Sequence, residues 1–194
     1  MCDIPGHLED MKTINKEQRK VTPEELAGRV ALSLAELDEW WHGWIIEDPQ
    51  ACYEIESTID STVIIDEDGP LFPTVLRYTS LSAAYLACTY DCGRIILLYL
   101  QRCLDMFVGD QLDVVSGRIN KTYLSANDNE GPLLGLCYDP TKLAHEILRS
   151  FDYCCEQAGG FMASFCVMVI ENIEYGALKP DSREAKWLKG RSMH

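Results

Sequence analysis

The chain has 194 residues, 47% of them hydrophobic and 25% charged, which is typical of one globular domain rather than of a disordered or fibrous chain. Its 31 Asp and Glu against 17 Lys and Arg give a formal charge of −14. Such a charge repels phosphate backbones and anionic membrane surfaces, so we expect no direct binding to nucleic acid and no membrane association.

The N-terminal region and the cysteines bear on where the protein resides. Residues 1–20 are polar and lack hydrophobic periodicity, so we expect a flexible tail there and one helical domain over residues 21–194. The start holds no apolar run of signal-peptide length, which favours an intracellular protein, nuclear or cytoplasmic. The nine cysteines, most of them in apolar segments and none in a C-x-x-C pair, are expected as reduced, buried thiols with no metal site.

A helix is predicted to begin at the "TPEE" of residues 22–25. Thr22 suits the N-cap, Pro23 the first helical position, and Glu25 closes a capping box. One apolar face then runs to the residue before Pro49 at spacings of three and four: Leu26, Val30, Leu34, Leu37, Trp41 and Trp44. The tryptophans of "EWWHGW" are expected to pack in the core, with a platform for a stacked ligand as the alternative.

The segment 51–70 does not decide between helix and strand. Two isoleucines four residues apart suit a helix, whereas "STVII" at 61–65 suits a short strand. "IDEDGP" at 65–70 has the composition of a turn. Pro70 and Pro73 keep the lead-in to the next element extended, because proline disfavours helix for the residue before it.

The most apolar part of the chain follows. Its uncharged run from Tyr78 to Tyr90 spans thirteen residues, and Asp91, Arg94 and Arg102 interrupt what comes after. A membrane helix needs roughly 20 predominantly apolar residues. We therefore expect a core helix of about 25 residues that begins near Ser80 and is surrounded by other helices.

Residues 139–158 carry the clearest helix signals. Asp139 is suited to the cap, Pro140 to the first position, and Gly159 or Gly160 to the end. The apolar face is predicted to consist of Leu143, Ile147, Phe151, Cys154 and Ala158. The opposite, polar face is predicted to consist of His145, Arg149, Asp152 and Glu156.

The remaining segments complete an all-α prediction. We expect a loop over residues 124–132, a buried helix over 161–175, and a short amphipathic helix over 181–188 with Asp181 and Glu184 in a capping box. Because no segment shows a convincing period of two, the fold is predicted to be a single helical domain of about six to eight helices around one or two buried apolar helices.

Few residues suggest chemistry. The chain has no Gly-rich phosphate loop, no G-x-S-x-G elbow and no H-E-x-x-H, and we predict no cofactor. His42 and His145 remain as proton shuttles, although a lone histidine on a helix face is more often structural. Asp91 and Arg94 lie on the apolar helix and need partners if buried, for which an ion pair is the simpler expectation and a catalytic carboxylate the alternative.

Four stretches resemble the C-terminal helical regulatory domain of fungal binuclear zinc-cluster transcription factors. These are "FPTVLRYTSLSAA", "RIILLYLQ", "AHEILRSFDYCCEQAGG" and "SREAKWLKG", and the resemblance spans roughly residues 34–190. It departs from the family in two places. Only Cys2 occurs in the first fifty residues, so the six-cysteine DNA-binding module is missing, and "SFCVMVI" at 164–170 lacks the family's proline and arginine.

The resemblance implies a regulatory domain that binds a hydrophobic small molecule or a protein partner without contacting DNA. The alternative is a cofactor-free enzyme of a fungal secondary-metabolite pathway that acts on a hydrophobic metabolite by acid–base catalysis in a helical pocket. Candidate catalytic residues are His145, Asp91 and His42. Candidate ligand-binding residues are Trp41, Tyr85, Tyr90 and Arg149. The apolar helices are also compatible with a homodimer.

Overall fold

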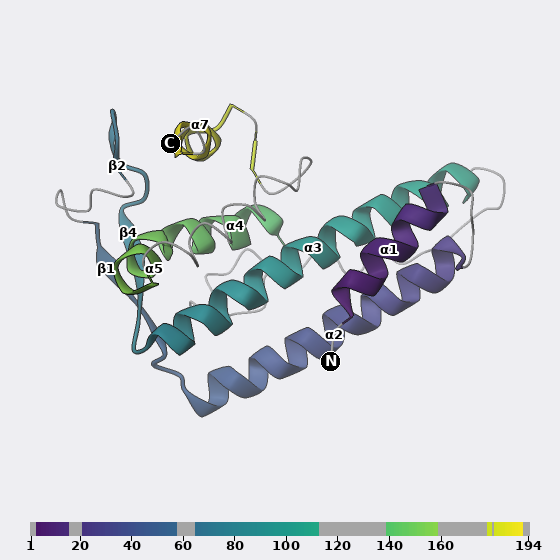
Figure 1. Cartoon of the computed structure of the whole chain (residues 1–194), viewed down its shortest axis with the longest axis horizontal. Coiled ribbons are helices and arrows are strands. Elements are labelled where there is room, and N and C mark those ends of the chain that lie inside the picture. Colours follow the sequence, from purple (N-terminus) through teal and green to yellow (C-terminus); the bar gives the residue numbers. More distant parts are fainter. Residues whose placement is uncertain are drawn as a thin grey trace.

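The computed structural model describes residues 3–15, 21–57, 65–112, 139–158, 178–179 and 181–191. Its longest elements are two helices that lie side by side, α2 (Pro23–Glu47) and α3 (Leu81–Leu112) (Figure 1). A short helix, α1 (Ile4–Asn15), lies across both of them near one end. The helices α4 (Pro140–Arg149) and α5 (Phe151–Ala158) pack against α3 at the other end, together with a hairpin in which β1 (Cys52–Glu56) pairs with β4 (Thr74–Tyr78).

Helix α2 begins as predicted. The hydroxyl of Thr22 accepts a hydrogen bond from the Glu25 amide, and the Glu25 carboxylate accepts one from the Thr22 amide, so both halves of the capping box are present. The predicted apolar face turns inward, with Leu26, Val30 and Trp41 buried. The helix ends before Pro49, as expected.

The tail expected over residues 1–20 contains a helix instead, α1 (Ile4–Asn15). The Asp3 carboxylate accepts a hydrogen bond of 3.0 Å from the Gly6 amide and so caps the first turn. Met11 and Ile14 are buried against α2 and α3. The segment folds because these few side chains cover the apolar surface of two other helices, a tertiary effect that its polar composition conceals.

A small antiparallel sheet corrects the all-α prediction. Strand β1 (Cys52–Glu56) pairs with β4 (Thr74–Tyr78), and the ladder runs from the Cys52–Tyr78 pair to the Glu56–Thr74 pair. Of the residues in β1 only Cys52 is buried, so this strand lacks the alternation that identifies strands in a sequence. The described part of the chain is nevertheless mostly helical, as predicted.

The predicted turn at 65–70 is present. Strands β2 (Ile65–Asp66) and β3 (Gly69–Pro70) pair across it, and Gly69 has a φ of 103°, a conformation that glycine adopts without strain. The amide of Ala83 donates a 3.1 Å hydrogen bond to the Ser80 hydroxyl, so the next helix, α3, is capped where we expected. It continues to Leu112, further than the predicted length.

Helix α3 is the core helix of the fold. Its stretch Leu81–Phe107 is long and apolar enough to cross a membrane by length and composition alone. However, 61% of its most apolar window is buried inside the protein, against α1, α2, α4, α5 and the hairpin. This burial agrees with the predicted core helix.

The helix predicted over residues 139–158 is divided in two. Helix α4 (Pro140–Arg149) ends at Ser150, and α5 (Phe151–Ala158) begins directly after it. Asp139 caps α4 as predicted, with its carboxylate 2.9 Å from the Thr141 amide. Asp152 is buried, so the expectation that it lies on a polar face is wrong.

The last described helix is α7 (Arg183–Arg191), close to the predicted position. Its first turn is capped by the Ser182 hydroxyl, which accepts a hydrogen bond from the Ala185 amide, rather than by Asp181. The predicted loop at 124–132 and the predicted helix at 161–175 lie outside the described residues.

Candidate functional site

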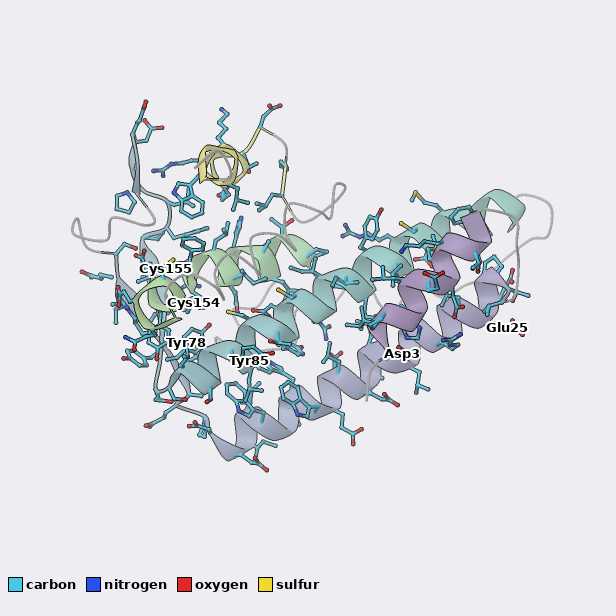
Figure 2. The ribbon with its side chains drawn as sticks, in the orientation of Figure 1. Asp3, Glu25, Tyr78, Tyr85, Cys154 and Cys155 are labelled. Atoms are coloured by element: carbon cyan, nitrogen blue, oxygen red, sulfur yellow. The ribbon has the colours of Figure 1, made fainter. Side chains whose placement is uncertain are left out.

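The residues predicted to line one pocket are distributed over several parts of the fold. His42 is exposed on α2, and Tyr85 is exposed near the start of α3. Trp41 and Tyr90 are buried between α2 and α3, and His145 lies on α4. Figure 2 shows Tyr85 on the first turns of α3.

Trp41 and Tyr90 belong to a structural network between α2 and α3. Their rings stack with centroids 4.1 Å apart and planes within 6°. The Tyr90 hydroxyl donates to an Asp38 oxygen at 3.2 Å and accepts from the Arg94 guanidinium at 3.2 Å. Arg94, which is fully buried, also forms an ion pair with Asp38. The arginine therefore has an inter-helix partner, as one of our expectations proposed.

Asp91 does not share that partner. Among the described residues its charged neighbour is another carboxylate, Glu146 of α4. Burial, together with the charge of Glu146, raises the pKa of Asp91 well above its usual value. Burial also raises the pKa of Glu146 to about 7, an effect opposed by the charge of Arg149 and reinforced by Glu54. The two carboxyl groups thus form a pair, and we name it the carboxyl pair.

A thiol and a hydroxyl lie near the carboxyl pair at the base of the hairpin. Burial and the charge of Glu146 raise the pKa of the Cys52 thiol to about 12, so this cysteine is held as a thiol at neutral pH. The Tyr78 hydroxyl lies 2.6 Å from the Ser150 hydroxyl, which donates to the Glu146 carbonyl. Glu146 was not among the predicted site residues, because a glutamate between apolar helix positions gives no sign that it is half-buried.

His145 and Arg149 have structural partners on other elements. The His145 ring lies 5.3 Å from that of Phe72 and 3.7 Å from a carboxylate oxygen of Glu184, and burial lowers its pKa. Arg149 donates to the Thr74 carbonyl and hydroxyl and forms an ion pair with Glu54. Arg149 therefore connects α4 to β1 and β4.

An open hollow lies on the surface of α2. Six residues form this hollow of about 460 Å³: Glu36, Glu39, Trp40, Gly43, Trp44 and Glu47. Their spacings of three and four place them on one face of the helix. We name this surface the acidic tryptophan face. Sequence analysis named three tryptophans and assigned only Trp41 to ligand binding, whereas Trp40 and Trp44 are the ones that border the hollow.

A second hollow, of about 450 Å³, lies between α1 and α3. Its walls are mainly apolar and include Leu8, Met11, Tyr99, Cys103 and Phe107. None of the predicted catalytic or ligand-binding residues borders it or the hollow on α2. In the described ranges, no three His, Cys, Asp or Glu side chains are grouped so as to hold a metal ion.

Comparison with known proteins found no matching protein-family model, no matching curated protein and no matching solved structure. The resemblance to zinc-cluster regulators therefore stays a prediction.

Proposed function

We propose that the protein is a helical partner-binding module that does not contact nucleic acid, and that the acidic tryptophan face of α2 is its binding surface. One observation carries this proposal. Trp40 borders the hollow and is 45% exposed, and two further apolar side chains of α2 outside the hollow, Leu32 and Ile46, are 62% and 67% exposed. An exposed tryptophan beside a hollow is typical of interaction sites, where this residue is enriched.

One wall of the hollow is held in place by side chains of the core, so a partner can bind without rearrangement of this wall. The Trp44 ring stacks on that of Trp41, with centroids 4.8 Å apart, and Trp41 in turn stacks on Tyr90. A surface side chain that is held by the core loses little conformational entropy when a partner binds. Trp residues are also enriched among those that dominate binding energy at interfaces.

The proposal agrees with the role implied by the resemblance, in which a helical regulatory domain recruits a partner while a separate module contacts DNA. The charge of −14 supports the absence of direct nucleic-acid binding here. A homodimer formed through this face is disfavoured, because two copies would bring the same glutamates together.

Site-specific photo-cross-linking tests the proposal. A benzophenone amino acid is placed at the exposed Ile46, one turn after Gly43, and, as a control, at the exposed Lys142 of α4 in cells that produce the protein. We expect a discrete adduct with an identifiable protein from position 46 only, and we expect Trp40→Ala to abolish it. Equal adducts from both positions, or an adduct that also forms in the Trp40→Ala variant, would contradict the claim that the acidic tryptophan face is the binding surface.

The carboxyl pair favours a second candidate function, acid–base catalysis on a hydrophobic metabolite. A carboxyl group whose pKa is raised to about 7, as in Glu146, can hold or release a proton near neutral pH. Incubation with metabolite extracts, followed by mass spectrometry, tests this function. Product that is formed by the wild type and lost with Glu146→Gln supports the enzyme, whereas unchanged extracts contradict it.

A further inference from the structure

The shape of the acidic tryptophan face resembles the receiving half of a helix–helix contact. Residues at i, i+3, i+4 and i+7 of a helix surround a hole into which a side chain of a second helix inserts. Trp40, Gly43, Trp44 and Glu47 have this spacing and border the same hollow. A Cβ built on Gly43 meets no atom within 4 Å, so the floor of the hole is open.

The charge of this part of α2 selects the sign of the partner. From Ala31 to the end of the helix at Glu47 the sequence holds four carboxylates and no Lys or Arg, and apart from Asp38, which pairs with the buried Arg94, these carboxylates border the hollow. The last turn of α2 has no basic residue, and Glu47 lies at the negative end of the helix dipole. A cationic partner offsets both sources of negative potential.

The exposed indole of Trp40 adds a reason for a cationic partner. Lys and Arg head groups are attracted to the face of a tryptophan ring, and their methylene stems cover apolar surface. Glu36 lies one helical turn before Trp40, and Glu39 borders the same hollow. Aromatic and acidic groups therefore alternate along the same face.

We propose that the partner element is a basic amphipathic helix of another protein, with an aliphatic side chain inserted above Gly43 and Lys or Arg residues placed against Glu39 and Glu47. This inference deepens the proposed function and rests on it. A second copy of this chain does not meet the requirement, because its own α2 face carries the same sign. Nucleic acid is repelled by the same charges.

Calorimetric titration with three synthetic peptides tests the inference. The first is an 18-residue helix with leucines on one face and lysines and arginines beside them, the second has the same composition in an order that removes the amphipathic face, and the third replaces the basic residues with glutamate. We expect micromolar binding of the first peptide only, weakened at least tenfold between 50 and 300 mM salt. Equal binding of the second peptide would overturn the inference, because charge alone would then explain the affinity.

Variants locate the contact. Gly43→Leu fills the hole, and no atom obstructs the added side chain at its Cβ. We expect Gly43→Leu to lower the affinity for the first peptide at least tenfold, and we expect the same of Glu39→Lys. The control is Glu67→Lys, an equal charge reversal in the exposed turn between β2 and β3, expected to change the affinity less than twofold. Circular dichroism verifies that each variant is folded.

The claim that the partner is a basic helix and the claim that the acidic tryptophan face is the binding surface can be contradicted independently. If the first peptide does not bind but position 46 cross-links to a natural partner in a Trp40-dependent way, the basic helix is wrong and the binding surface stands. Unchanged peptide affinity in Gly43→Leu likewise overturns the helix-in-hole geometry. If Trp40→Ala leaves both the cross-link and the peptide affinity unchanged, the proposed function itself is wrong.

Discussion

Trp41 and Tyr90 stack almost in parallel, with ring centroids 4.1 Å apart and planes 6° from one another. This contact joins the two long helices, and through the stacking of Trp44 on Trp41 it also joins the core to the acidic tryptophan face. The surface hollow therefore has one wall that belongs to the core. Neighbouring tryptophans on α2 thus have different roles, one structural and one at the surface.

Mutation of the neighbouring tryptophans separates these roles. Trp41→Ala is expected to lower the free energy of unfolding by about 3–5 kcal/mol, because it leaves a cavity in the core. Trp40→Ala is expected to change it by less than about 1 kcal/mol, because the side chain is largely exposed. Guanidinium unfolding followed by circular dichroism measures both, and similar losses for the two variants would contradict the assignment.

The buried arginine of α3 gives a second prediction. Arg94→Met removes the guanidinium that pairs with Asp38 and is expected to cost about 3–5 kcal/mol, because the Asp38 carboxylate loses its buried counter-charge. The control is Arg102→Met, an exposed position on the same helix, expected to change stability by less than about 0.5 kcal/mol. A small effect at Arg94, measured by urea unfolding, would mean that the ion pair does not organise the core.

The carboxyl pair predicts an unusual dependence of stability on pH. The pKa of Glu146 is raised on folding, so the folded state binds more protons than the unfolded state between about pH 4 and 7. The free energy of unfolding therefore falls as pH rises through this window. Glu146→Gln is expected to flatten the decline and to raise stability at pH 8 by about 2 kcal/mol.

Urea unfolding at several pH values between 4.5 and 8 measures this effect, and Glu156→Gln is a control of opposite sign. Arg77 lowers the pKa of Glu156, so this carboxylate contributes stability above its unfolded pKa that is lost as pH falls. Its removal is expected to lower stability slightly at neutral pH. A Glu146→Gln variant that is less stable than wild type at pH 8 would refute the account of the carboxyl pair.

Helix α1 provides a fourth prediction. Ile14 is buried against α2 and α3, so Ile14→Ala is expected to cost about 2–4 kcal/mol. The control is Lys12→Ala in the same helix, where the side chain is 69% exposed and its pairing with Glu9 is at the surface, and we expect a change below about 0.5 kcal/mol. Equal melting temperatures for Ile14→Ala and wild type would show that α1 does not contribute to the core.

Local signals in the sequence predicted the parts of the fold that local interactions determine. The capping box of Thr22 and Glu25, the Asp139 cap and the start of α3 after Ser80 are all confirmed. Each depends on residues within one helical turn of one another. For the same reason, the composition of residues 65–70 was sufficient to locate the turn around Gly69.

Contacts between distant segments determined what the sequence did not reveal. Helix α1 is stabilised by Met11 and Ile14 against helices that follow much later, and β1 exists through its pairing with β4 rather than through its own pattern. Asp91 was correctly identified as an unusual residue, but its neighbour Glu146 lies on another helix, and no spacing connects the two. The hollow on α2 was missed because a periodic pattern shows which residues face the core. It does not show whether exposed residues such as Trp40 and Gly43 border a hollow.

The affinity of the cross-linked natural partner for the wild-type protein and for Trp40→Ala tests the central claim most directly. Calorimetric titration with the purified partner is expected to show at least a tenfold loss for Trp40→Ala, with Glu67→Lys within twofold of wild type. Equal affinities of wild type and Trp40→Ala would contradict the claim that the acidic tryptophan face is the binding surface.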